Sequence, residues 1–210
     1  RKNGGYKQPG GELVAGIQII PLTTSRAASS FHINTYCIGT KKLTLIDPAT
    51  NIPGEMRKLL QYLHALEGEG RKIVRIILTH QPPTASLPCL KHLQRELSLP
   101  FHVSPGISRS FKSQIRCSPI TPQLEAKLTM DHASPWKILY HSFYEHKALS
   151  LTNGRFVIAG LWLTPLQHYL QKVGTHFKPD IFPGTEIERV QFAFPAYGPP
   201  IASPKLHIAD

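Results

Sequence analysis

The chain has 210 residues, of which 41% are hydrophobic and 18% charged, a balance that excludes an intrinsically disordered protein and suits one folded domain. Its 24 lysines and arginines exceed its 13 acids by 11, so the charge favours an anionic partner without identifying it. The longest strongly apolar run, Phe156 to Leu163, has the length of a strand, far short of the ~18–20 residues that cross a bilayer.

The cysteines give an expectation about the compartment. Cys37, Cys89 and Cys117 are odd in number and form no CxxC pair, which argues against a disulfide framework and a cysteine-rich zinc site. We expect all three to be small buried hydrophobes in an intracellular, reducing compartment. The sequence begins with Arg1, so we expect a processed product or a piece of a longer chain, in the cytoplasm or in an organelle matrix if processed.

The first half of the chain alternates strand and helix patterns. Residues 1–12 predict an entry arm, and residues 13–210 predict a single domain. Strands are expected at Val14 to Pro21, at 34–39 and 43–47 as a hairpin, at Ile73 to Leu78 and near Phe101 to Val103. Apolar residues at helical spacing predict helices at about 53–66, ended by Gly68 and Gly70, and at about 86–97.

The second half predicts more hairpins. Pro122 to Met130 fits a helix, and Thr164 to Val173 fits another. Asn153-Gly154 indicates a type I′ turn, and strands are expected at Trp136 to Tyr140, Ala148 to Leu151, Arg155 to Ala159 and near Gln191 to Phe194. Alternating elements mixed with hairpins indicate an α/β sandwich and argue against a purely parallel, doubly wound sheet.

Three stretches in order resemble the metallo-β-lactamase superfamily, especially its glyoxalase-like and endoribonuclease-like branch. They are the hairpin from Asn34 to Pro48, the run Ile76-Ile77-Leu78-Thr79-His80, and Phe194-Pro195-Ala196-Tyr197-Gly198-Pro199-Pro200-Ile201. Together they span most of the chain. The resemblance implies a four-layer αββα sandwich of two mixed sheets with outer helices.

The family's first metal motif, His-x-His-x-Asp-His, is mostly lost. Its first histidine matches His80, but the next three motif positions fall on Pro82, Thr84 and Ala85. None of these three side chains is a good metal ligand.

The later ligand positions are eroded as well. The next histidine falls on Tyr144 without a gap, or on His146 after a shift of two residues. The bridging aspartate falls on Leu161, and the closing histidine falls on Tyr197. His80 and His146 would provide two imidazoles and no acid, whereas catalytic zinc takes about three protein ligands and an open position.

Several side chains have simple structural interpretations. We favour His80 as a relic held by backbone hydrogen bonds at a strand end, and Asp47 as an acceptor for backbone groups at a strand-to-loop turn. His141 and His146 are expected on a loop, where they could hold adventitious zinc. There is no Gly-x-Ser-x-Gly elbow, P-loop or GxGxxG motif.

The positive charge is concentrated in one segment. Residues 70–124 hold eight cations against Glu96, or 8 − 1 = +7, and the predicted basic surface comprises Arg71, Lys72, Arg75, Lys91, Arg95, Arg109, Lys112 and Arg116. Phe101, His102 and Phe111 lie between them and could stack on bases. The alternative is an ordinary solvated basic surface.

These patterns favour a pseudoenzyme: a metallo-β-lactamase-like scaffold or binding module for a protein or ribonucleoprotein partner, with nucleic acid as a further candidate through the basic segment. No cofactor is expected. One alternative is a metal-dependent hydrolase, with zinc in a rebuilt mononuclear site around His80, His146 and Tyr197. Another is the silent domain of a longer, Nudix-type hydrolase, although no Nudix box is present.

Overall fold

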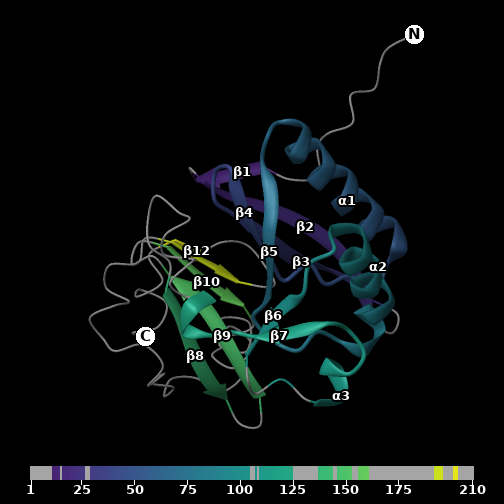
Figure 1. The fold of residues 1–210 in the computed structure, drawn as a ribbon, viewed down its shortest axis with the longest axis vertical. Coiled ribbons are helices and arrows are strands. Elements are labelled where there is room, and N and C mark those ends of the chain that lie inside the picture. The colour runs from purple at the N-terminus through teal and green to yellow at the C-terminus, as the bar shows by residue number, and fades with distance from the viewer. Residues whose placement is uncertain are drawn as a thin grey trace.

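Two β-sheets and the helices beside them make up the described part of the chain. The computed structural model describes residues 11–14, 16–26, 29–104, 107, 109–124, 137–143, 146–152, 156–160, 192–195 and 201–202. The first sheet has seven strands in chain order, β1 (Gly11–Val14), β2 (Ile17–Arg26), β3 (Ser29–Ile38), β4 (Lys42–Ile46), β5 (Lys72–Leu78), β6 (Phe101–Val103) and β7 (Cys117–Pro119). The second has the order β12 (Ile201–Ala202), β11 (Phe192–Pro195), β10 (Phe156–Gly160), β9 (His146–Thr152) and β8 (Lys137–Phe143) (Figure 1).

Both sheets are mixed, as the resemblance implied. In the first sheet β1 to β4 pair antiparallel and β4 to β7 pair parallel. The parallel neighbours are joined by helices, because a parallel crossover needs a long connection: α1 (Pro53–Gly68) links β4 to β5, and η1 (Thr84–Ser86) with α2 (Leu87–Leu97) links β5 to β6. In the second sheet only β10 and β11 pair parallel.

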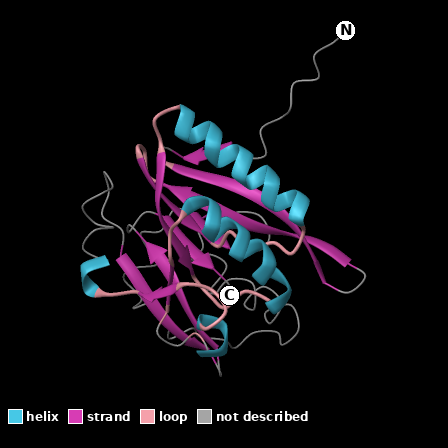
Figure 2. Cartoon of the chain, turned by 45° about the vertical axis from the view of Figure 1, so that its right-hand side comes forward, coloured by secondary structure: helices cyan, strands magenta, loops and turns pink. Residues whose placement is uncertain are grey.

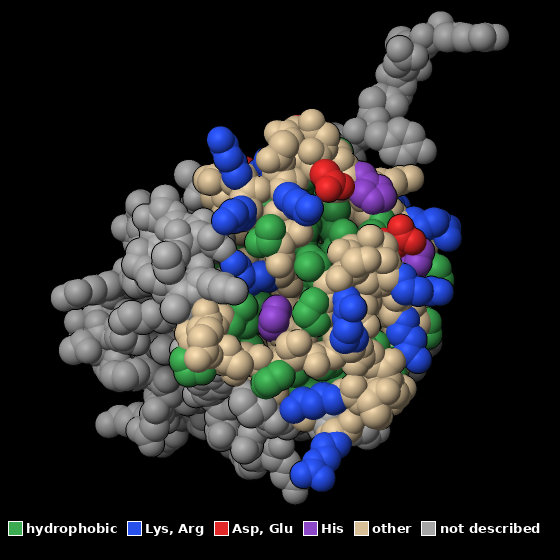
Figure 3. All heavy atoms as spheres, viewed as in Figure 1, with side chains coloured by type: hydrophobic (Ala, Val, Ile, Leu, Met, Phe, Trp, Pro, Cys, Tyr) green, Lys and Arg blue, Asp and Glu red, His purple; other side chains and the backbone are tan. Residues whose placement is uncertain are grey.

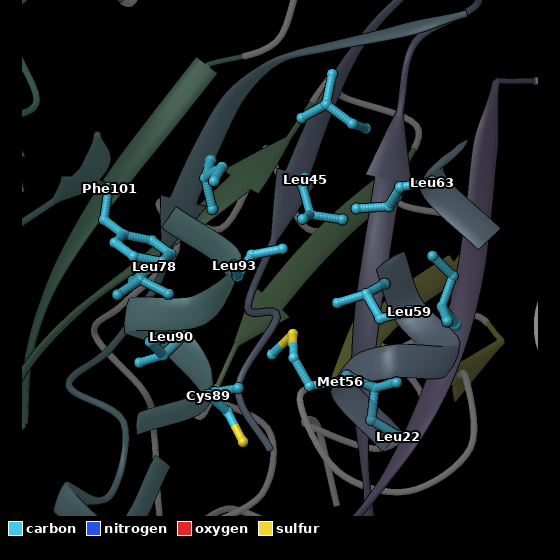
Figure 4. Close-up of a cluster of buried hydrophobic side chains, with 14 of the residues drawn as sticks. Leu22, Leu45, Met56, Leu59, Leu63, Leu78, Cys89, Leu90, Leu93 and Phe101 are labelled. Atoms are coloured by element: carbon cyan, nitrogen blue, oxygen red, sulfur yellow. The ribbon is translucent and has the colours of Figure 1, made fainter. Parts of the chain in front are cut away.

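The outer layer consists of α1 and α2, which cover one face of the first sheet. Pro53 begins α1, and its buried face presents Met56, Leu59, Leu63 and Leu66 at helical spacing. The helix ends near Gly70, whose φ of +78° favours glycine, and the Arg71 N–H donates to the Leu66 carbonyl at 2.9 Å. Figure 4 shows this layer with side chains from β2, β4, β5, β6, α1 and α2, including Leu22, Leu45, Leu78, Leu90, Leu93 and Phe101.

The inner layer lies between the two sheets. One buried cluster joins first-sheet residues to second-sheet residues, and its members are Ile17, Tyr36, Ile38, Ile46, Ile77, Ile120, Leu124, Ile138, Leu151 and Ile158. The two sheets therefore pack face to face, and the described layers run helix, sheet, sheet (Figure 2). The helix expected at Thr164 to Val173 lies outside the described residues.

Most predicted elements of the first half are confirmed. The 34–47 hairpin appears as β3 paired with β4, and α1, β5, α2 and β6 occur within a few residues of their predicted bounds. The strand expected at Val14 to Pro21 is confirmed over residues 17–21, which belong to β2, but its start is wrong. Gly16, with φ +79°, turns the chain there and separates β1 from β2, which pair antiparallel. β1 begins at Gly11, inside the predicted arm.

The second half holds elements that the sequence did not predict, namely β7, β12 and the short helix α3 (Arg109–Lys112). The strands expected at 136–140, 148–151, 155–159 and 191–194 are confirmed as β8, β9, β10 and β11. His141 and His146 lie in β8 and β9, so their placement on a loop is wrong. Residues 122–124 are helical, as expected for the start of the helix predicted at Pro122 to Met130. The rest of that segment and the Asn153-Gly154 turn lie outside the described residues. None of the helices that the structure describes is long and apolar enough to cross a membrane.

Candidate functional site

Two neighbouring strand ends carry the candidate site. β4 and β5 are parallel neighbours, with Ile46 aligned to Ile77, so the residues that follow them meet at one edge of the sheet. Asp47 follows β4, and Thr79 with His80 follows β5. All three are buried, with exposed fractions of 1%, 0% and 3%.

Asp47 holds Thr79 with both carboxylate oxygens. Its Oδ1 accepts the Thr79 backbone N–H at 2.7 Å, and its Oδ2 accepts the Thr79 hydroxyl. The structural role predicted for Asp47, as an acceptor for a backbone group, is confirmed. Its own backbone is fixed as well, because the Asp47 N–H donates to the Ile77 carbonyl at 3.0 Å and the Thr35 hydroxyl donates to the Asp47 carbonyl at 3.0 Å.

The Thr79 side chain also orients His80. Thr79 Oγ1 lies 2.9 Å from His80 Nδ1, and Asp47 Oδ2 lies 3.7 Å from the same nitrogen. The imidazole is therefore fixed through a side-chain hydroxyl, whereas the sequence predicted backbone hydrogen bonds. Its other nitrogen, Nε2, is buried and has no hydrogen-bond partner among the described residues.

The hydroxyl has one proton to donate, which links the tautomer of His80 to the charge of Asp47. When Asp47 is ionised, Thr79 donates to it, His80 Nδ1 donates to Thr79, and Nε2 presents a bare lone pair. When Asp47 is protonated, the chain of donors reverses and Nε2 carries the proton. Burial raises the pKa of Asp47, opposed by His80 and the Thr79 hydrogen bonds. Burial lowers the pKa of His80 and so favours the neutral imidazole, and the charge of Asp47 opposes this shift.

The residues present do not fit the metal that the resemblance implies. His80 offers one suitable nitrogen, but Pro82 is buried without a donor, and Thr84 and Ala85 are exposed in η1. Within the described residues no three side chains of histidine, cysteine, aspartate or glutamate are grouped so that they could hold a metal ion. His146 lies in β9 opposite Phe143, and Tyr144, Leu161 and Tyr197 lie outside the described residues.

The predicted basic surface needs one correction. Arg75 is only 7% exposed, and its guanidinium donates to the Thr44 hydroxyl at 3.4 Å, so it does not belong to the surface. It lies two residues before Ile77 and therefore on the face that packs toward the second sheet. The exposed members are Lys72, Lys91, Arg95, Arg109 and Arg116, and the half-buried ones are Arg71 and Lys112.

Two of the three aromatic residues of this segment are not available for stacking on bases. Phe101 and Phe111 are 0% and 2% exposed, so that expectation is wrong, and His102 is half-buried. Two of the three cysteines, Cys37 and Cys89, are buried as expected, and Cys117 is half-buried. Sequence reasoning assigned no role to Thr79. Its position between a buried strand and His80 was the available signal.

Comparison with known proteins agrees on the fold. No protein-family model matches the sequence, and no curated protein matches it either. Among solved structures, the chain is similar to a metallo-β-lactamase from Pontibacter korlensis, with TM-score 0.57, 11% identity and 95% of each chain covered. It is also similar to diflavin flavoprotein A 5, fragment 1–254, from Nostoc sp. PCC 7120, with TM-score 0.63, 13% identity, and 93% of this chain and 89% of that one covered.

A third similar structure is the Flv1 flavodiiron core from Synechocystis sp. PCC6803, with TM-score 0.68 and 12% identity; the match covers 95% of this chain and 58% of that one. At these identities the likeness concerns the fold. The conclusion about the fold rests on three observations. The two mixed sheets pack face to face, helices cover the first sheet, and these solved structures are similar over most of this chain. The chain has the metallo-β-lactamase fold.

Proposed function

We propose that this chain is a catalytically silent metallo-β-lactamase-like domain that acts as a scaffold or binding module in a protein or ribonucleoprotein assembly. The observation that carries the proposal is the chemistry of the motif positions. Pro82, Thr84 and Ala85 stand where the resembled family has two histidines and an aspartate. A metal-activated water would then have neither enough ligands nor a carboxylate to orient it.

The proposal includes an architecture. Residues 13–210 form one domain, a four-layer αββα sandwich of two mixed sheets with outer helices. We propose an intracellular location in a reducing compartment, consistent with free cysteines. No cofactor is needed for a binding role.

Metal content and turnover of the purified, untagged protein test this function. We expect less than stoichiometric zinc and iron by elemental mass spectrometry, and no hydrolysis of phosphodiester or thioester substrates. Tightly bound stoichiometric metal together with turnover would overturn the proposal.

One observation favours a second candidate, a metal-dependent hydrolase with a rebuilt mononuclear site around His80. The Nε2 atom of His80 is buried and without a partner among the described residues, as a metal-ligating nitrogen would be in a structure without metal. His80→Ala separates the two candidates, with His64→Ala on the exposed side of α1 as control. The hydrolase predicts loss of metal and activity in His80→Ala alone. The silent scaffold predicts a change in stability alone.

A further inference from the structure

A groove beside the metal-motif positions lies against α2. It has a volume of about 520 Å³, and its lining residues are Thr84, Leu87, Pro88, Lys91, Arg95 and Gln114. Two separate parts of the chain form it, because Gln114 follows α3 while the other residues lie on η1 and α2. Thr84, which stands at the motif aspartate position, belongs to this groove, so the groove adjoins the eroded motif.

The charge of the groove is entirely positive. Lys91 and Arg95 are exposed, and none of the described residues that line the groove is acidic. Glu96 is the one acid of the sequence between residues 84 and 116, against five cations, or 5 − 1 = +4. Its carboxylate lies 3.8 Å from His92 Nδ1. Figure 3 shows lysine and arginine side chains gathered on the side of the molecule that carries α2 and α3.

The two lining cations have a defined spacing. Lys91 and Arg95 are four residues apart in α2, so they lie on the same face of the helix with a rise of about 6 Å between them. Neither makes an ion pair with any residue in the described parts of the chain. Both charges are thus available to a partner with two anionic groups at the same spacing.

The remaining lining residues decide between classes of partner. Pro88 is exposed and Leu87 is mostly buried, and both are apolar, whereas Gln114 is an exposed amide. No aromatic side chain is among the described lining residues, and the nearby Phe111 is buried. Single-stranded nucleic acid is bound by aromatic stacking combined with a positively charged track, and the described lining of this groove provides the charge without the aromatic side chains. Carboxylates with aliphatic neighbours match both the cations and the aliphatic surface.

We propose that the α2 groove docks an acidic polypeptide segment, in which two carboxylates one helical turn apart pair with Lys91 and Arg95. This inference rests on the proposed function of a binding module and names its partner by chemistry. An acidic amphipathic helix fits best, because glutamates at positions i and i+4 have the same rise as the two cations. Its aliphatic residues would cover Pro88, which is exposed.

The experiment compares a matched pair of charge-reversal variants of the full chain. The variant Lys91→Glu/Arg95→Glu reverses the charge of the groove. The control Lys41→Glu/Arg57→Glu makes the same change in net charge at two exposed cations outside the groove. The probes are a fluorescein-labelled helical peptide with paired glutamates and leucines, the same peptide with glutamine at each glutamate, and labelled oligouridylate. Circular dichroism establishes that both variants keep the wild-type fold.

The proposal expects the glutamate peptide to bind more tightly than the other two probes. Its affinity should fall about tenfold or more in the groove variant and less than about twofold in the control. Tighter binding of oligouridylate, with the same loss in the groove variant, would overturn the proposal in favour of nucleic acid. Equal losses of peptide affinity in both variants would show that the effect comes from the net charge of the protein alone, and this result would also overturn the proposal. None of these outcomes depends on metal content or turnover. The failure of this proposal can therefore be distinguished from the failure of the proposed catalytic silence.

Discussion

Asp47 and Thr79 are joined by two hydrogen bonds, one from the Thr79 backbone N–H at 2.7 Å and one from its hydroxyl. They connect the end of β4 to the end of β5, and through Thr79 they fix the imidazole of His80. This arrangement has a structural reason of its own, because its polar groups are buried and need one another as hydrogen-bond partners.

Replacement of Thr79 measures how much its hydroxyl group contributes to the free energy of unfolding. Thr79→Val keeps the shape but leaves Asp47 Oδ2 and His80 Nδ1 without their shared partner, so we expect a loss of about 1–3 kcal/mol in the free energy of unfolding. Thr79→Ser retains the hydroxyl and should lose less. Urea unfolding of the three proteins makes the comparison, and equal stability of the two variants would contradict it.

Replacement of Asp47 separates its hydrogen bonds from its backbone conformation. Its φ is +51°, in the left-handed region that short polar side chains tolerate better than alanine. We expect Asp47→Ala to lose about 2–4 kcal/mol, because the Thr79 N–H is left unpaired and alanine is strained. Asp47→Asn keeps an acceptor and the conformation, so urea unfolding should show less than half of that loss. Similar losses in the two variants would refute this account.

We expect His102 to make the free energy of unfolding depend on pH. Burial, followed by the charge of Arg75, lowers the pKa of His102 below its ordinary value of 6.5. Below that pH the unfolded chain binds a proton that the folded chain does not, so falling pH favours unfolding. Between about pH 7.5 and 5.5, the stability of the wild type should fall more steeply than that of His102→Asn. Urea titrations at each pH measure both slopes, and parallel slopes would remove His102 as the cause.

The three cysteines should differ in reactivity. Burial raises the pKa of Cys37 to about 12 and removes its thiolate at neutral pH, whereas Cys117 is half-buried. N-ethylmaleimide near neutral pH should therefore modify Cys117 first and Cys37 only after unfolding. Peptide mapping by mass spectrometry reads the order, with denatured protein as the reference in which all three react. Labelling of Cys37 in the folded protein at the rate of Cys117 would contradict the burial.

Local patterns in the sequence determined much of the fold. The leucine spacing of α1 has the helical period, and the apolar run from Ile73 to Leu78 has the length of a buried strand, so both could be predicted without tertiary information. The order of the three family-like stretches indicated the metallo-β-lactamase fold, and the absence of histidine and aspartate side chains at Pro82, Thr84 and Ala85 can be seen in the sequence itself. These features depend on residue identity and spacing alone.

Only the tertiary structure decided which side chains are covered. The residue pattern around Arg75 and Phe111 predicts a basic surface with aromatic side chains. Both residues are nevertheless buried, because the exposure of a side chain depends on the layer that packs against its face of the sheet or helix. Gly16 splits a continuous strand pattern through its positive φ, which alternation does not encode. The contact of Asp47 with Thr79 and the groove that brings Gln114 to Lys91 join residues far apart in sequence. The sequence thus determined most of the helices and strands and the residue types at the motif positions, whereas burial and long-range contacts depend on how the two sheets pack.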